Sequence, residues 1–138
     1  MRYLLVILLL IVSTAMTPRE IKTVHTIALK YVFFDFNSYA YKDSSDEREF
    51  NSEYKALKLF LSRNHEVLLT LHSFQNNRER DDLAKQRALK ILNDMIRIGC
   101  EKQRIIIIAE PIVAITDSTD EAEKMLSQKV SFTLENLK

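Results

Sequence analysis

Several residue types are scarce in this sequence, and their scarcity excludes whole classes of site. The 138 residues include one glycine, two prolines, one cysteine and no tryptophan. A single glycine excludes a glycine-rich phosphate-binding loop, and it leaves turns of positive φ to Asn, Asp or Ser. The lone cysteine, Cys100, excludes a disulfide within the chain. Because Cys100 follows Gly99 at an expected helix end, we interpret it as a partly buried structural thiol, with an intermolecular disulfide as the alternative.

An excess of charge of one sign is also absent. The 20 Lys and Arg residues nearly balance the 19 Asp and Glu residues, which gives a net charge of +1. This balance excludes the basic surface that nucleic-acid-binding proteins present to phosphates. Apolar residues make up 46% and charged residues 28%, which is typical of a globular protein. The length suits one domain with a hydrophobic core.

The one long apolar run lies at the N-terminus and is too short to span a bilayer. It extends from Tyr3 to Val12, after the basic start at Arg2, and the small residues 13–15 follow it. A transmembrane helix needs about 20 apolar residues. We therefore interpret residues 1–15 as a secretory signal peptide cleaved after Ala15, with an uncleaved anchor as the alternative. No cysteine near this boundary offers a lipid attachment site, and we expect no transmembrane span in the mature chain.

Four segments have the composition of β-strands. Residues 16–29 contain Pro18 and mixed polarity and are interpreted as a lead-in segment. Aromatic and β-branched residues then predict a strand over residues 30–36. Continuous apolar runs predict buried strands over residues 67–71 and 104–108, and strict alternation predicts a last strand over residues 130–134.

Helical periodicity separates these strands. One amphipathic stripe is formed by Phe50, Tyr54, Leu57 and Leu61, and Ser44 with Glu47 has the spacing of a capping box before it. A second helix is predicted over residues 81–98, with Asp81 and Asp82 at its positive end and Gly99 as its C-terminal cap. Its apolar positions are Ala84, Ala88, Ile91, Met95 and Ile98. A short helix is predicted over residues 121–126.

The predicted order is strand, helix, strand, helix, strand, short helix, strand. Strands that alternate with helices require crossover connections and a sheet with helices packed on it. We therefore predict an α/β fold, in the form of an α+β sandwich, with a mixed sheet packed by two main helices. Residues 30–138 form this single domain.

Several short motifs in this order resemble the OmpA-like domain of bacterial outer-membrane and flagellar-stator proteins. They are the aromatic-Asp-aromatic strand at residues 32–38, the Leu-Ala-Lys-Gln-Arg-Ala run at 83–88, Gly99 ahead of Arg-Ile at 104–105, and Lys124 with Ser-Gln-Lys-Val at 127–130. The resemblance covers residues 30–134. It implies an exported, periplasmic protein of the cell envelope, associated with the outer membrane or the cell wall, and peptidoglycan as a ligand.

The resemblance fails at one end of the ligand pocket. In the family, an Asp in a Gly-His-Thr-Asp motif accepts the amine of diaminopimelate, and the Arg of the second helix pairs with a carboxylate of the same ligand. This chain keeps the Arg as Arg87, but its motif reads Leu-His-Ser-Phe, with Phe74 at the Asp position. A phenyl ring cannot neutralise an ammonium group, so the ligand charge would be buried unpaired. A shifted alignment of the loop would instead bring in Asp81 or Asp82 as a substitute anion.

The resemblance nominates seven ligand-binding residues: Arg87, His72, Ser73, Phe74, Arg80, Lys124 and Lys129. Arg80 replaces an Asn of the family, and Ser-Gln-Lys at residues 127–129 replaces Asn-Arg-Arg. The alternative for Arg87 is an exposed helix residue paired with Asp82 or Asp94. The alternative for His72 is a structural hydrogen bond.

Other polar and aromatic residues give weaker hypotheses. We interpret Asp35 as a structural carboxylate that faces away from Phe34 and Phe36. Tyr39 and Tyr41 are candidates for contact with a partner, or else they pack on the domain's own helix. The three histidines lack the spacing of metal ligands and no nucleophile stands in a recognisable motif. We therefore expect no catalytic residues, metal or cofactor.

Two functional hypotheses follow. In the first, the protein is a non-catalytic component of an envelope assembly that binds protein partners, and its peptidoglycan binding is weak or lost. In the second, it is a working peptidoglycan-binding module that anchors an envelope component to the wall through Arg87. The loss of the Asp at position 74 favours the first hypothesis.

Overall fold

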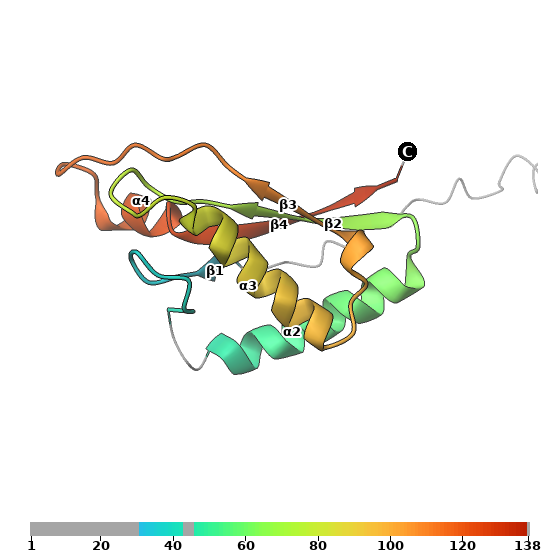
Figure 1. Ribbon diagram of the computed structural model, residues 1–138. Coiled ribbons are helices and arrows are strands. Elements are labelled where there is room, and N and C mark those ends of the chain that lie inside the picture. The colour runs from blue at the N-terminus through green and yellow to red at the C-terminus, as the bar shows by residue number, and fades with distance from the viewer. Residues whose placement is uncertain (1–30, 43–45, 138) are drawn as a thin grey trace, which may run out of the picture.

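The computed structural model describes residues 31–42 and 46–137, with the backbone alone for residues 46–50. Figure 1 shows a sheet with helices α2 and α3 on one face. In chain order the elements are β1 (Val32–Phe33), α2 (Asp46–Arg63), β2 (Val67–Ser73), α3 (Leu83–Arg97), a 3₁₀ turn (Lys102–Arg104), β3 (Ile105–Ala109), α4 (Glu121–Leu126) and β4 (Lys129–Asn136). No helix in the described ranges is long and apolar enough to cross a membrane.

The sheet is mixed, and β2 lies inside it. The strand order is β1-β4-β2-β3, in which β2 runs parallel to β3 and antiparallel to β4. Leu71 of β2 is aligned with Ile107 on one side and Phe132 on the other. The parallel pair requires a crossover, which α3 provides. The predicted fold class, a mixed sheet packed by two main helices, is confirmed.

The core lies between the sheet and the two long helices. Tyr54, Leu57 and Leu61 of α2 meet Leu69 and Leu71 of β2 in one buried cluster. The apolar stripe of α3 joins this cluster through Ile91, Leu92 and Met95. Burial of each such side chain stabilises the fold by about 1.5–3 kcal/mol. The helical periodicity of the sequence therefore identifies the core faces of both helices, while the side chain of Phe50 lies outside the described residues.

The first strand is shorter than the sequence predicts. Only Val32 and Phe33 pair with β4 as a strand, and Phe34 adds an isolated bridge to Tyr41. Asn37 then takes a φ of 53° and turns the chain. Asparagine tolerates this left-handed conformation better than most residues, so an Asn replaces the glycine that such a turn often uses. The loop that follows approaches the start of α3.

The second long helix begins two residues later than the sequence predicts. Asp82 has a φ of 61° and precedes the helix, and neither Asp81 nor Asp82 lies within α3. The predicted C-terminal cap is confirmed, because Gly99 has a φ of 98° and its N–H donates to the carbonyl of Ile96. Cys100 follows it as a buried residue, and burial raises the pKa of its thiol.

The prediction that the third strand is buried is wrong. Ile106 and Ile108 are 41% and 40% exposed, because β3 is the outer strand of the sheet. The short helix α4 has the predicted bounds, and β4 continues beyond the predicted strand to Asn136. The predicted signal peptide, the lead-in segment and the capping box at Ser44 fall on residues outside the described ranges and stay predictions.

Candidate functional site

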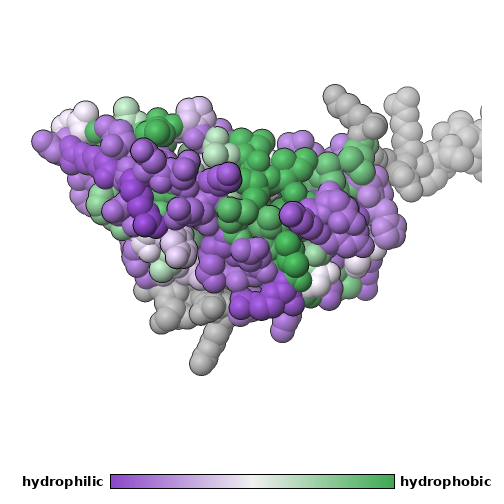
Figure 2. Space-filling model, viewed as in Figure 1, coloured by the Kyte–Doolittle hydropathy of each residue, from purple (hydrophilic) through white to green (hydrophobic). Residues whose placement is uncertain are grey.

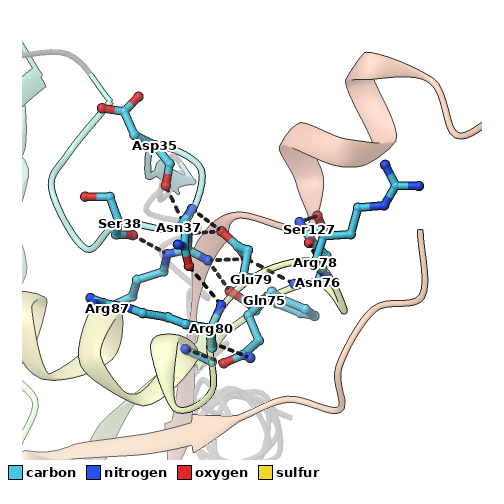
Figure 3. Close-up of polar contacts among 12 residues, drawn as sticks. Asp35, Asn37, Ser38, Gln75, Asn76, Arg78, Glu79, Arg80, Arg87 and Ser127 are labelled. Carbon is cyan, nitrogen blue, oxygen red and sulfur yellow. Dashed lines mark hydrogen bonds and ion pairs between the residues drawn. The ribbon is translucent and has the colours of Figure 1, made fainter. Parts of the chain in front are cut away.

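Arg87, on the inner side of α3, is the most deeply buried charged side chain that the sequence nominated. Its exposed fraction is 0%, and its guanidinium group points toward the loops that follow β1 and β2 (Figure 3). Nε donates to the carbonyl of Ser38 at 3.0 Å. Nη1 donates to the carbonyl of Phe74 at 3.0 Å and Nη2 to that of Asp35 at 3.1 Å. Three backbone carbonyls from two loops therefore hold the edge of the guanidinium group.

The remaining donors of Arg87 are taken by Glu79. Nη1 lies 3.0 Å from Oε2 of Glu79, and Nη2 lies 2.5 Å from Oε1. Both side chains have an exposed fraction of 0%. A guanidinium group has five N–H donors, and here each has an acceptor within the chain. The pair is bidentate, which is the strongest geometry of an Arg–carboxylate contact.

The carboxylate of Glu79 is satisfied as completely as the guanidinium group. Oε1 also accepts the backbone N–H of Asn37 at 2.9 Å, and Oε2 accepts that of Asn76 at 3.1 Å. A carboxylate offers about four acceptor positions, and all four are used. Because an unpaired charge in the interior is costly, these contacts stabilise the ion pair in the folded chain.

Amide side chains fix the loop that carries Glu79 (Figure 3). Oδ1 of Asn37 accepts the N–H of Arg80 at 2.8 Å, which joins this loop to the loop after β1. Oε1 of Gln75 accepts the N–H of Ala84 at 2.8 Å and so satisfies a free donor in the first turn of α3. Nδ2 of Asn76, a fully buried residue, donates to Ser127 at 3.0 Å. The loop is therefore held from three directions.

Solved structures with this arrangement of elements identify the fold. The peptidoglycan-associated lipoprotein from Burkholderia pseudomallei aligns with a TM-score of 0.60 and 16% identity, over 78% of this chain and 92% of that chain. The C-terminal domain of MotB from Helicobacter pylori aligns with a TM-score of 0.58 and 13% identity, over 78% and 85%. The OmpA-like domain of FopA1 from Francisella tularensis aligns with a TM-score of 0.52 and 14% identity, over 78% and 72%.

The chain has the OmpA-like fold. No protein-family model and no curated protein matches it. The predicted resemblance is therefore confirmed as a divergent OmpA-like domain, on the evidence of its fold.

The alternative considered for Arg87 is wrong. Arg87 is not an exposed helix residue paired with Asp82 or Asp94, because it is buried against Glu79. Asp94 instead pairs with Lys90 and Arg97. Asp81 and Asp82 are exposed and lie before α3, and a role for either as the substitute anion stays a prediction. The anion that pairs with Arg87 is Glu79, which sequence reasoning missed. It stands in the polar run Asn-Asn-Arg-Glu-Arg at residues 76–80, where no periodic spacing connects it to α3.

Phe74, at the position of the family's Asp, contributes only its backbone to Arg87. Its ring lines a cleft of about 320 Å³ between the loop at residues 113–119 and α4. Nζ of Lys129 lies 5.4 Å from the ring centroid, at cation–π distance. The cleft is otherwise lined mainly by Val113, Ala114, Ile115 and Leu126. Thr119, Glu123 and Ser127 complete the lining, so the cleft beside Phe74 holds one acid and one base among mainly apolar groups.

A second cleft, of about 480 Å³, lies between the loop after β1 and α4. Asp35 and Lys124 are among the residues that line it. Lys124 is paired with Glu121 at 2.8 Å. Arg78, on the same cleft, pairs with Asp117 at 2.5 Å, and its hydrogen bond and charge hold the pKa of that carboxyl below its usual range. Lys42 also lines the cleft and lies 3.3 Å from the sulfur of Met125. Arg78 and Lys124 thus already pair with carboxylates of the domain, whereas Lys42 contacts a thioether.

The remaining nominated residues are spread over the domain. His72 lies on the sheet face away from α2 and α3, where its ring nitrogens contact Glu110 at 2.6 Å and Thr133 at 2.9 Å. These are structural hydrogen bonds, as the alternative for His72 anticipated. Ser73 is fully buried, and its Oγ has no hydrogen-bond partner within the described ranges. Arg80 is exposed and contacts Gln86 at 3.0 Å.

The loop after β1 differs in detail from expectation. Phe36 is 55% exposed, whereas Phe34 is fully buried, so the two rings do not share a buried face. The carbonyl of Asp35, not its carboxylate, holds Arg87. Tyr41 packs on the domain itself, where its hydroxyl donates to Asp94 at 2.5 Å. Tyr39 is exposed, with Arg80 near its ring, and stays a candidate for partner contact.

Proposed function

We propose that this protein is a non-catalytic, exported component of a bacterial cell envelope, located in the periplasm, whose OmpA-like domain binds protein partners and has weak or no affinity for peptidoglycan. One observation carries the proposal. The carboxylate of Glu79 occupies the guanidinium fork of Arg87 in the folded chain. The neighbouring folds supply the context, since one of them belongs to a peptidoglycan-associated lipoprotein.

A ligand carboxylate would have to displace Glu79 before it could pair with Arg87. Displacement would leave the Glu79 carboxylate without its cation, and a buried charge that loses its partner costs about 3–5 kcal/mol. Even a penalty of about 3 kcal/mol lowers an affinity by about 100-fold. The Glu79 carboxylate therefore competes with any ligand carboxylate for the guanidinium group of Arg87.

The opposite end of the pocket also disfavours the family's ligand. An ammonium group bound near Phe74 would meet no carboxylate on that side chain, and the ring already lies beside Nζ of Lys129. Two cations near each other in a partly desolvated cleft repel. Glu123 lines the same cleft, so this end lacks the family's Asp but retains one acid, and the occupied fork of Arg87 is the stronger obstacle to a diaminopimelate-type ligand.

Co-sedimentation with purified peptidoglycan sacculi tests the proposal. We expect the wild-type protein to stay in the supernatant at physiological ionic strength. A Glu79→Ala, Phe74→Asp double variant empties the Arg87 fork and restores the family's acid, and we expect it to sediment with the wall. Glu110→Ala, on the far face of the sheet, is the matched control and should stay in the supernatant.

Sedimentation of the wild-type protein with the wall would favour the alternative function. Saturable sedimentation of the wild type that Arg87→Lys abolishes would establish the alternative function, a peptidoglycan anchor that works through Arg87. In that case Glu79 would have to leave the fork when the wall binds.

A further inference from the structure

Met125 is the described methionine whose side chain is open to solvent. The chain has four methionines, of which the structure describes Met95 and Met125. Met95 is fully buried in the core, whereas Met125, near the end of α4, is 36% exposed and lines the cleft of about 480 Å³. A methionine thioether is oxidised to a sulfoxide where an oxidant can reach it. The two residues should therefore differ widely in reactivity.

The end of the domain that carries α4 is open to water. In Figure 2 the hydrophobic residues of this view gather over β3 and the adjoining part of α3, whereas the end that carries α4, on the left in Figure 1, is mainly hydrophilic. Each residue of α4, all within the described ranges, is at least partly exposed. A small water-soluble oxidant therefore has access to Met125.

The ammonium group of Lys42 lies against the sulfur of Met125. Nζ of Lys42, in the loop after β1, is 3.3 Å from Sδ of Met125. Among the described residues this sulfur is the one hydrogen-bond acceptor of the ammonium group, and no described carboxylate pairs with it. A thioether is a weak acceptor. The contact therefore places a cation with three donors beside an atom that satisfies them poorly.

Oxidation of the sulfur makes this contact stronger. A sulfoxide is polar, and its oxygen accepts a hydrogen bond far better than a thioether sulfur does. A hydrogen bond from a charged donor is roughly twice as strong as one between neutral groups. Lys42 and Met125 are 83 residues apart in the sequence, so such a bond joins the loop after β1 to α4 across the cleft.

We propose that Met125 is a site of reversible oxidation by peroxide, and that Lys42 holds the resulting sulfoxide as a latch between the loop after β1 and α4. One oxygen of hydrogen peroxide is transferred to Sδ as the O–O bond breaks and an S–O bond forms. The sulfur is oxidised by two electrons, and the peroxide is reduced to water. A methionine sulfoxide reductase reverses the step. The cellular setting rests on the proposed export of the protein, whereas the chemistry tested below does not.

Lys42 also favours one of the two sulfoxide epimers. The sulfur of a sulfoxide is chiral, and separate reductases act on the two epimers. An ammonium group beside the sulfur donates a hydrogen bond to the departing hydroxide, and a positioned donor of this kind accelerates the transfer on its own side. The same group then stabilises the epimer whose oxygen faces Nζ. The wild-type protein should therefore give an uneven mixture of epimers.

Mass spectrometry after treatment with hydrogen peroxide tests the site. In the folded protein Met125 should gain oxygen at least about tenfold faster than Met95, because the core shields Met95 from the oxidant. In concentrated urea the two rates should become similar. Equal rates in the folded protein overturn the assignment of Met125 as the reactive site.

Reduction by the two epimer-specific reductases tests the role of Lys42. After oxidation, each reductase is added separately and the fraction of Met125 that it restores is measured. We expect a several-fold difference between the two in wild type and an even division in Lys42→Ala. Lys42→Arg keeps a cation and should keep the bias, and Lys55→Ala, on the exposed side of α2, is the matched control and should do the same. An even division in wild type, or an undiminished bias in Lys42→Ala, overturns the role of Lys42.

Hydrogen exchange at the backbone N–H of residue 42 tests the latch. This N–H donates to the carbonyl of Phe33 at 3.2 Å, so its exchange requires the loop after β1 to open locally. Peroxide treatment should slow the exchange several-fold in wild type. The same treatment should leave the exchange unchanged in Met125→Leu, which has no sulfur at this position, and in Lys42→Ala. Unchanged or faster exchange in the oxidised wild-type protein overturns the latch.

Discussion

Glu79 and Arg87 form a bidentate ion pair in which both side chains are completely buried. The pair joins the loop after β2 to helix α3, and the carbonyls of Ser38 and Asp35 connect it to the loop after β1. In the family that the sequence resembles, the matching Arg pairs with a ligand carboxylate. In this structure the carboxylate that Arg87 contacts belongs to Glu79 of the same chain.

The first prediction concerns the energy of this pair. Glu79→Ala should lower the free energy of unfolding by about 3–5 kcal/mol, because it leaves the Arg87 charge buried without a partner. The double replacement Glu79→Leu, Arg87→Met removes both charges and should cost less than the single change. Urea denaturation measures both. Asp117→Asn, which breaks an exposed pair with Arg78, is the control and should change the stability far less, because exposed ion pairs contribute little.

The second prediction is that a small carboxylate rescues the Glu79→Ala variant. The substitution leaves a space beside two unpaired N–H donors, one on Nη1 and one on Nη2, and acetate fits this planar fork. About 100 mM acetate should raise the Tm of this variant relative to chloride at equal ionic strength, since a ligand that binds only the folded state stabilises it. Wild type and the Glu79→Leu, Arg87→Met variant should show no difference between the two salts. A rescue of wild type as large as that of Glu79→Ala would mean that acetate acts elsewhere.

The third prediction concerns the end of α3. Gly99 has a φ of 98°, and an added Cβ would lie 2.9 Å from Nζ of Lys58. Gly99→Ala should destabilise the fold by about 1–2 kcal/mol, because L-residues disfavour positive φ. The lysine can move away, so the backbone and not the contact sets the cost. A Lys58→Ala, Gly99→Ala double variant that unfolds like wild type would contradict this reasoning.

The fourth prediction concerns alkaline pH. Burial, with the neighbouring Tyr54 as the next cause, raises the pKa of Tyr41 far above its usual range, and burial also raises that of Tyr54. Above about pH 10 the unfolded tyrosines lose protons that the folded ones keep, so the stability falls as the pH rises, by at most about 1.4 kcal/mol per pH unit for each group. Absorbance of tyrosinate should show these two groups ionising only as the protein unfolds. Ionisation of Tyr41 and Tyr54 near pH 10 in the folded protein would contradict this prediction.

Sequence patterns predicted the helices and strands better than they predicted the position of each strand in the sheet. Helical spacing located the buried faces of α2 and α3 because those positions meet one core. The isoleucines of β3 showed an apolar strand, but apolarity does not reveal whether a strand lies inside a sheet or at its edge. The position of β3 depends on which strands pair, which is a property of the whole sheet.

The candidate site likewise depends on contacts between distant segments, which local sequence patterns do not predict. Arg87 was found through its motif, but its partner was not. Glu79 reaches it from an irregular loop that Gln75, Asn76 and Asn37 hold in place. No period of the chain connects these positions, so the contact emerges only when the loops are folded together. The short β1 has a similar origin, since the positive φ of Asn37 ends the extended segment early.

The most direct test of the central claim observes Arg87 itself while the ligand is added. The Nε–H of Arg87 is bonded to a buried carbonyl, and it should give a slowly exchanging signal in a ¹⁵N-labelled NMR spectrum, assigned by its loss in Arg87→Lys. With meso-diaminopimelate added to millimolar concentration, we predict no change in this signal for wild type and a saturable shift for the Glu79→Ala, Phe74→Asp variant. A saturable shift in the wild-type protein would show that Glu79 yields its place to the ligand, and would contradict the account.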